Sequence, residues 1–189
     1  PVIWLVSLLL LLNFRIDAQN TGLSTSDSFN LTMPINFVDS TPSVNAEYLM
    51  KEAIVHYDAK RYESCLNKLD KAISINNFAQ LNDILFFYRA VCKTKIKKYT
   101  AAIEDYNKAI VYNANKPKYF YYRGLAYFNG GHYNKALKDF EYTVEKQGED
   151  ADLRLKIGFL KEQKNLLHDA LDDYGKAIEF NPKLAEAYF

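Results

Sequence analysis

The strongest constraint on how this chain folds is a pattern that returns every 34 residues from about position 83 onward. The interval is seen in the aspartates Asp105, Asp139 and Asp173, and again in alanines at positions 102, 136 and 170. A fourth copy upstream keeps the internal offsets but lies three residues out of phase, which a short insertion near 77–81 would explain. A period of this length is typical of repeat proteins, whose units each pack only against their neighbours.

Each copy of the pattern predicts a helix, a turn and a second helix. Apolar residues recur at helical spacing over 118–129 and 133–145, with two glycines between the blocks. Pro117 suits a first helical position, where its missing N–H costs nothing. The chain has 7 Gly and 5 Pro, too few for the many tight turns of a small β-sandwich. We therefore expect an all-α fold in which Gly124 faces Ala136 where the two helices of a unit cross.

The motifs themselves resemble those of a known family. The segments Tyr121-Tyr122-Arg123-Gly124-Leu125-Ala126-Tyr127 and Ala170-Leu171-Asp172-Asp173-Tyr174 closely resemble tetratricopeptide repeats. The resemblance covers 46–189 and places units near 46–79, 83–116, 117–150 and 151–184, with a fifth beginning at 185. It implies a right-handed α-solenoid of helix-turn-helix units.

The first 45 residues predict export and a linker. Residues 1–14 carry no charge and are shorter than a membrane-spanning helix, and Ala18 supplies a small residue for a signal peptidase. We interpret 1–18 as a signal peptide, with an uncleaved membrane anchor as the competing interpretation, and we expect a protein of the periplasm or the cell exterior. Residues 19–45 are rich in Ser, Thr and Asn and predict a flexible linker, in which Asn30 begins a glycosylation sequon.

The resemblance also implies a concave groove formed mainly by the first helix of each unit. Apolar and aromatic residues occupy its positions, and the predicted groove consists of Met50, Ile54, Tyr57, Phe87, Val91, Tyr121, Leu125, Phe128, Leu155 and Phe159. The set of Lys and Asn residues with which some family members hold a C-terminal carboxylate is missing, so a receptor for chaperone tails is not predicted. An apolar peptide, an amphipathic helix or the chain's own N-terminal arm would fit better. The alternative is that several of these side chains are core between units.

Charges recur at matching positions of the two helices within a unit. We predict ion pairs there, namely Arg89 with Asp105, Arg123 with Asp139, and, with the signs reversed, Glu52 with Lys68. The fourth unit has Ile157 opposite Asp173 and is expected to lack the pair. Exposed ion pairs contribute about 0 to 1 kcal/mol in general, so we expect these to fix helix register more than stability. Independent solvated charges are the alternative.

Two further clusters have more ordinary interpretations. Lys93, Lys95, Lys97 and Lys98 crowd one turn, with Lys116 and Lys118 expected nearby; we expect a solvated face rather than a patch that attracts an anionic surface. Cys65 and Cys92 lie on helices that pack together in this family. Two buried free thiols are expected there, with a disulfide as the alternative, because disulfide geometry is strict.

The sequence contains no motif for catalysis or cofactor binding, so we expect neither a catalytic site nor a cofactor. The histidines His56, His132 and His168 fall at different positions of their units, so the repeat does not gather them into a metal site. The net charge of +1 favours no nucleic acid. We predict a non-enzymatic scaffold that binds another protein, without cofactor or small-molecule substrate, touching a membrane only through an uncleaved signal segment. It is also expected to self-associate through an uncapped C-terminal end. The alternative is an extracytoplasmic sensor module of a larger signalling or enzymatic protein.

Overall fold

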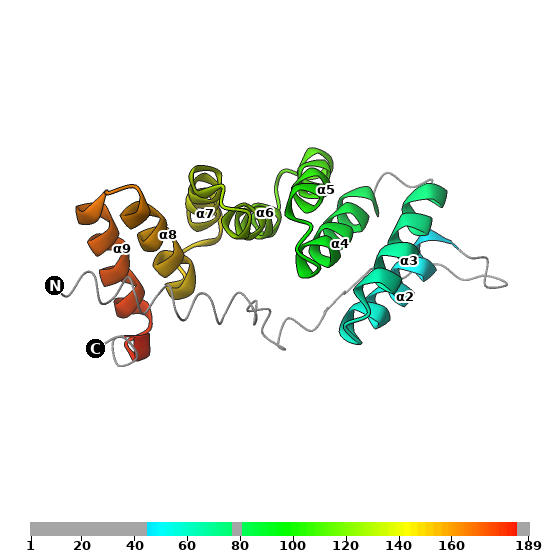
Figure 1. Ribbon diagram of the computed structural model, residues 1–189, viewed down its shortest axis with the longest axis horizontal. Coiled ribbons are helices and arrows are strands. Elements are labelled where there is room, and N and C mark those ends of the chain that lie inside the picture. The colour runs from blue at the N-terminus through cyan, green and yellow to red at the C-terminus, as the bar shows by residue number, and fades with distance from the viewer. Residues whose placement is uncertain (1–44, 77–80, 185–189) are drawn as a thin grey trace. The chain divides into compact units, whose positions relative to one another are not determined.

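A computed structural model describes residues 45–76 and 81–184, and every regular element in these ranges is an α-helix (Figure 1). The helices are α2 (Ala46–Asp58), α3 (Tyr62–Ile75), α4 (Asn82–Lys95), α5 (Tyr99–Tyr112), α6 (Pro117–Asn129), α7 (Tyr133–Gln147), α8 (Ala151–Gln163) and α9 (Leu167–Phe180). The predicted signal peptide, the linker up to residue 44, the proposed insertion at 77–80 and the start of a fifth unit at 185 lie outside the described residues.

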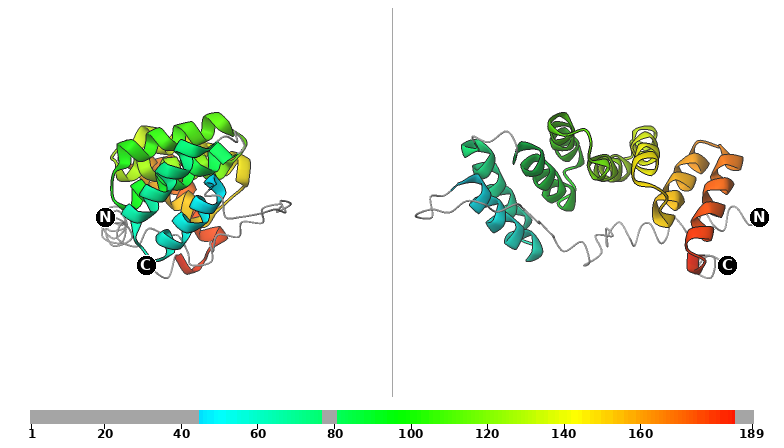
Figure 2. Two further views of the ribbon diagram at one scale, coloured as in Figure 1. Left: turned by 90° about the vertical axis from the view of Figure 1, so that its right-hand side faces the viewer. Right: turned by 180° about the vertical axis from the view of Figure 1, so that it is seen from behind.

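The helices form four consecutive pairs. Within each pair the two helices pack together, and the second helix of a pair then packs against the first helix of the next, as Figure 2 shows from two further directions. The first helices α4 and α6 also touch each other. The prediction of an all-α solenoid built from helix-turn-helix units is confirmed for this part of the chain.

The turn inside each pair has one repeated backbone geometry. Lys60, Lys97, Gly131 and Asn165 all take left-handed conformations, with φ of 56°, 61°, 78° and 61°. The N–H groups of each of these residues and of the residue after it donate to carbonyls of the preceding helix. In the first pair they are Lys60 to Tyr57 and Arg61 to His56, both at 2.8 Å. This is a Schellman cap, and its repetition gives every pair the same reversal of direction.

Small residues line the contact between the helices of a pair. A Cβ atom on Gly124 would lie 2.6 Å from the ring of Phe140 and 3.2 Å from the Cβ of Asp139. A Cβ atom on Gly158 would lie 2.6 Å from the ring of Tyr174 and 3.2 Å from the carbonyl oxygen of Ala170, which corresponds to Ala136 in the repeat; the contact of Gly124 with Ala136 itself stays a prediction. The glycines are therefore required by an aromatic ring one turn further along the second helix, because no side chain fits beneath it.

Candidate functional site

The predicted ion pairs form, and each joins the two helices of a unit. Arg89 donates two hydrogen bonds of 2.7 Å to the Asp105 carboxylate, from Nε and Nη2. Arg123 donates to the Asp139 carboxylate in the same way, at 2.8 and 2.7 Å. The sign-reversed pair is present too, with Lys68 Nζ 2.8 Å from Glu52. The prediction of contact is confirmed in all three units.

The expectation that these pairs are exposed was wrong for the arginine pairs. Asp105 and Asp139 are 1% and 5% exposed, because the second helix turns them toward the first helix of its own unit. The Lys93 ammonium adds a third bond to Asp105, at 2.6 Å. Burial lowers the pKa of Arg89, but hydrogen bonds to carboxylates outweigh it and leave the pKa above the ordinary value. These pairs are thus part of the core rather than of the surface.

The arginines also connect neighbouring units, which the sequence pattern did not predict. Arg89 donates from Nη1 to Asp70 of α3 at 2.7 Å, and Arg123 donates from Nη1 to Asn107 of α5 at 2.8 Å. Asp70 and Asn107 occupy corresponding positions in the first and second units. Each guanidinium therefore bonds its own unit and the preceding one, which fixes the stacking of one pair on the next.

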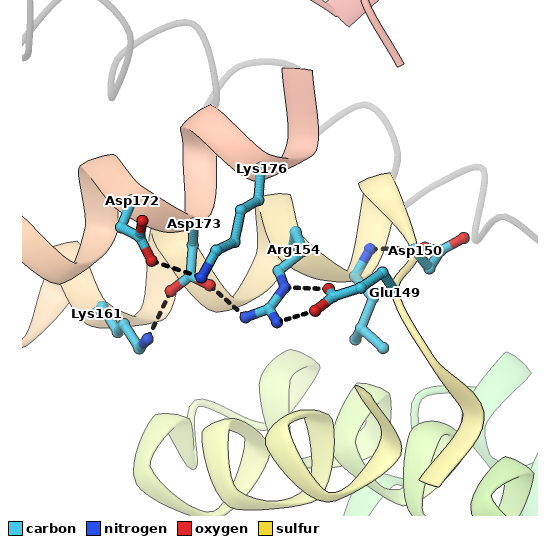
Figure 3. Close-up of polar contacts among 8 residues, drawn as sticks. Glu149, Asp150, Arg154, Lys161, Asp172, Asp173 and Lys176 are labelled. Carbon is cyan, nitrogen blue, oxygen red and sulfur yellow. Dashed lines mark hydrogen bonds and ion pairs between the residues drawn. The ribbon is translucent and has the colours of Figure 1, made fainter. Parts of the chain in front are cut away.

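The fourth unit pairs its aspartate by another route, which corrects the expectation that it stays unpaired (Figure 3). Asp173, 0% exposed, accepts hydrogen bonds of 2.6 Å from Arg154 Nη1 and from Lys161 Nζ. Arg154 lies one helical turn before Ile157 and also forms two bonds of 2.5 Å to Glu149. The hydrogen bonds from Arg154 lower the pKa of Glu149 below its usual value. A buried carboxylate requires a cation, and a different turn of α8 provides it.

The ten predicted groove residues divide into two groups by exposure. Four are buried as core between units, namely Met50, Phe87, Val91 and Phe159. The other six are half-buried on α2, α6 and α8, and we call them the first-helix face: Ile54, Tyr57, Tyr121, Leu125, Phe128 and Leu155. Their role in binding stays a prediction.

Buried rings join the first helices beneath this face. The Phe87 ring on α4 lies 4.8 Å from that of Tyr119 and 5.3 Å from that of Tyr122, both on α6. The Phe128 ring on α6 lies 5.7 Å from that of Phe159 on α8. These contacts join α4, α6 and α8, and the half-buried face residues of α6 and α8 form an apolar strip over them.

Lys118 is a cation beside the strip that the sequence pattern of apolar groove residues did not predict. The Lys118 ammonium, exposed on the first turn of α6, lies 5.5 Å from the Phe87 ring centroid and 5.7 Å from that of Tyr122. Its register position, the second of the third unit, is a groove position and could have identified it.

Two basic residues expected in the lysine cluster are bonded to buried carboxylates, and one of them bonds at the other end of α4. Lys93 is bonded to Asp105, and Lys116 donates at 3.0 Å to Asp83 at the opposite end of α4. Asp83 is 6% exposed and also accepts a 2.9 Å bond from the Tyr119 hydroxyl. The buried carboxylate of Asp83, at the start of α4, attracts the Lys116 ammonium. The sequence pattern had instead predicted Lys116 near the lysines at the end of α4.

Cys65 and Cys92 are both buried free thiols, as expected. Hydrogen bonding to Cys65 and burial raise the pKa of the Cys92 thiol. Within residues 45–76 and 81–184 no group of His, Cys, Asp and Glu could hold a metal ion. No helix in those ranges is long and apolar enough to span a membrane.

Parts of this chain are similar to known proteins in sequence. The family described as TPR repeat matches residues 94–131. An Hsp70/Hsp90 co-chaperone of Saccharomyces cerevisiae, CNS1, is 29% identical over 91 residues, which are 48% of this chain and 24% of the relative. Serine/threonine-protein phosphatase 5 of Homo sapiens is 28% identical over 111 residues, 59% of this chain and 22% of the relative. The chain thus spans about a quarter of the length of these relatives.

Solved structures share the fold. The crystal structure of MamA matches with a TM-score of 0.68 and 24% identity, covering 75% of this chain and 81% of that one. The first TPR of Spaghetti (RPAP3), solved bound to the HSP90 peptide SRMEEVD, matches with a TM-score of 0.59 and 21% identity, covering 65% of this chain and 95% of that one. At these identities the likeness concerns the arrangement of helices.

Proposed function

Because the helix pairs of this chain are tetratricopeptide repeats, we propose that it is a protein-binding scaffold that holds an extended or helical partner segment on the first-helix face. The observation that carries the proposal is the partial exposure of six apolar and aromatic side chains on the first helices, four of them on α6 and α8, which ring contacts join. Burying the rest of such a strip contributes about 25 cal/mol per Å² of apolar surface. Rings already held in place lose little side-chain entropy on binding.

The partner segment that fits is apolar rather than acidic. The RPAP3 repeat is bound to an acidic HSP90 peptide, which supports peptide binding as the use of this fold. On this chain the first-helix face carries Ile, Leu, Phe and Tyr side chains, and Lys118 is a cation beside it that already faces two rings. We therefore propose a segment with several apolar side chains and at most one acidic residue near α6.

We further propose that these repeats act by binding and catalyse no reaction of their own. Phosphatase 5 shows that a chain with such repeats can be an enzyme, but this chain matches only 22% of it. The charged groups that are brought together here, such as Arg89 with Asp105, are bonded to each other across helix contacts. Such groups hold the fold together and are not available to a substrate.

The test of the scaffold places a photo-crosslinking residue at Tyr121, on the strip, in the native host. A matched control places it at Val111, which is 83% exposed on α5. We expect a separate protein to be captured from position 121 and not from position 111. Equal capture at both positions, or capture at 121 of only the chain's own residues 19–45, would contradict the proposal.

We also propose that the chain is exported, on the basis of its apolar residues 1–14 and of Ala18. Fusing residues 1–45 to a reporter that is active only outside the cytoplasm tests this. Activity is expected with the natural segment and is expected to be lost when Leu9→Arg and Leu10→Arg interrupt the apolar run. Activity that survives both substitutions would refute export by this segment.

A further inference from the structure

The turns inside the first two units carry a group of exposed cations that the fold does not use. Lys60 and Arg61 follow α2, and Lys97 and Lys98 follow α4. All four are exposed, and within the described residues none of these side chains forms a hydrogen bond or an ion pair. By contrast, Arg89, Arg123 and Arg154 are all bonded to carboxylates. We call the four residues, together with Lys95, the turn patch.

The two turns lie beside each other because α3 and α4 pack together. The Arg61 carbonyl accepts the Cys65 N–H at 3.0 Å, and the Cys92 carbonyl accepts the Ile96 N–H at 3.3 Å. Each cysteine therefore lies one helical turn from the basic turn on its own helix. Because the Cys92 thiol is hydrogen-bonded to Cys65, the two basic turns are brought close together. Burial and the nearby charge of Lys60 both lower the pKa of Lys95, which agrees with this adjacency.

The patch is maintained against two costs to the fold. Lys60 and Lys97 hold the left-handed conformation that Gly131 and Asn165 hold in the later units, and a lysine is less stable there than either. Like charges on adjacent turns also repel one another. The Schellman cap requires the left-handed conformation at these positions, but it does not explain why both are lysines.

The position and surroundings of the patch define its ligand. The cations follow the turns of two neighbouring helix pairs, so their charges act together on a large anionic surface more than on a small ion. Tyr62 and Tyr99 directly follow the two basic pairs and are partly exposed, and tyrosine is typical of residues at a membrane interface. Two carboxylates, Asp58 and Glu63, accompany the first turn, which leaves the patch with a net positive charge.

We propose that the turn patch binds the surface of a bilayer that contains anionic phospholipids. Lysine and arginine within a Debye length of such a surface are attracted by its negative potential, and the attraction weakens as salt is added. The patch adjoins the first-helix face where the Tyr57 and Tyr62 rings lie 5.7 Å apart, but its cations lie on the turns and not on that face. The proposal does not depend on the proposed function.

The test compares two variants of the full chain with equal net charge. In Arg61→Glu/Lys98→Glu two patch cations become anions, while Lys71→Glu/Lys138→Glu changes two exposed lysines of α3 and α7. Partition is measured by co-sedimentation with vesicles of about 30% phosphatidylglycerol in phosphatidylcholine, and with phosphatidylcholine alone as the baseline for the apolar N-terminal residues. We expect the patch variant to bind the anionic vesicles at least about tenfold more weakly than the natural chain. The control variant should stay within about threefold, and binding above the baseline should be lost in high salt.

Several results would overturn the proposal. Equal weakening in both variants would mean that net charge alone governs binding, and no weakening in either would assign binding to another part of the chain. Displacement from vesicles by a soluble polyglutamate peptide, at a charge concentration equal to that of the lipid, would instead indicate an acidic protein segment. Tight binding of inorganic phosphate by calorimetry would indicate a soluble anion. Helical circular dichroism of each variant shows that it is folded.

Discussion

Removing the carboxylate of Asp105 is the sharpest test of the buried ion pairs. In Asp105→Ala, three charge-assisted hydrogen bonds of 2.6 to 2.7 Å disappear, two from Arg89 and one from Lys93. The arginine keeps its bond to Asp70, and the lysine side chain, 20% exposed, can turn toward water. The substitution also leaves a small cavity where α4 and α5 meet.

The expected loss of stability follows from the burial of these groups. Breaking a buried ion pair on one side costs about 3 to 5 kcal/mol, and both cations here keep a route to solvent or another carboxylate. The lower end, about 3 kcal/mol, is therefore expected for Asp105→Ala. For a chain of this length that corresponds to a fall in melting temperature of about 6 to 12 °C.

The assay is urea and thermal unfolding followed by circular dichroism, with Glu52→Ala as the matched control. Glu52 and Lys68 hold the same register positions with reversed signs, but their side chains are 33% and 35% exposed. The control should leave the melting temperature nearly unchanged, because exposed pairs contribute little. Because repeat units can unfold separately, midpoints and slopes are compared together. Equal small effects of both substitutions would refute the conclusion that burial makes the Asp105 pair stabilising.

Three further predictions follow from individual contacts. Gly124→Ala should destabilise the chain by about 1 to 3 kcal/mol, because the new Cβ would lie 2.6 Å from an aromatic ring. Gly175→Ala should stabilise the chain by about 0.5 to 1 kcal/mol, because a Cβ at this helical position has no atom within 4 Å. Urea unfolding measures both changes. The pKa of Glu149 is lowered in the folded state, so its contribution to the free energy of unfolding is present above its ordinary pKa and is lost as the pH falls. The difference in urea midpoint between the natural chain and Glu149→Gln should therefore shrink from pH 6 to pH 3. Cys65 and Cys92 should react with a thiol reagent only in denaturant, and fast reaction of the folded chain would show that they are not buried as described.

Much of the fold was predictable because the same helix-turn-helix pattern occurs several times in the sequence. The interval that relates Asp105 to Asp139 and Asp173 identified the units, and the apolar spacing identified two helices in each. The arginine and aspartate at matching positions predicted their own contact, since residues at fixed register on packed helices meet in every unit. The candidate face was predictable only in part: its residues were named from register, while their exposure was not.

Exposure depends on the neighbouring helix, which a repeat pattern does not describe. Phe87 and Phe159 share register with half-buried residues but are themselves covered by rings of the adjacent unit, at 4.8 Å from Tyr119 and 5.7 Å from Phe128. The turn patch arose in the same way, because Lys60 and Lys95 are 35 positions apart in sequence and become neighbours only when α3 packs on α4.

The sequence by itself determined the helices, their pairing and the register of the buried charges, because each depends on residues within one unit. Only the tertiary structure decided which carboxylates are buried, which cation serves Asp173, and that each arginine also bonds the preceding unit. The physical reason is that burial and hydrogen bonding are properties of the contact between units. At that contact a side chain such as Arg154 can replace one that the pattern lacks, because a buried charge takes a partner from any turn that can reach it.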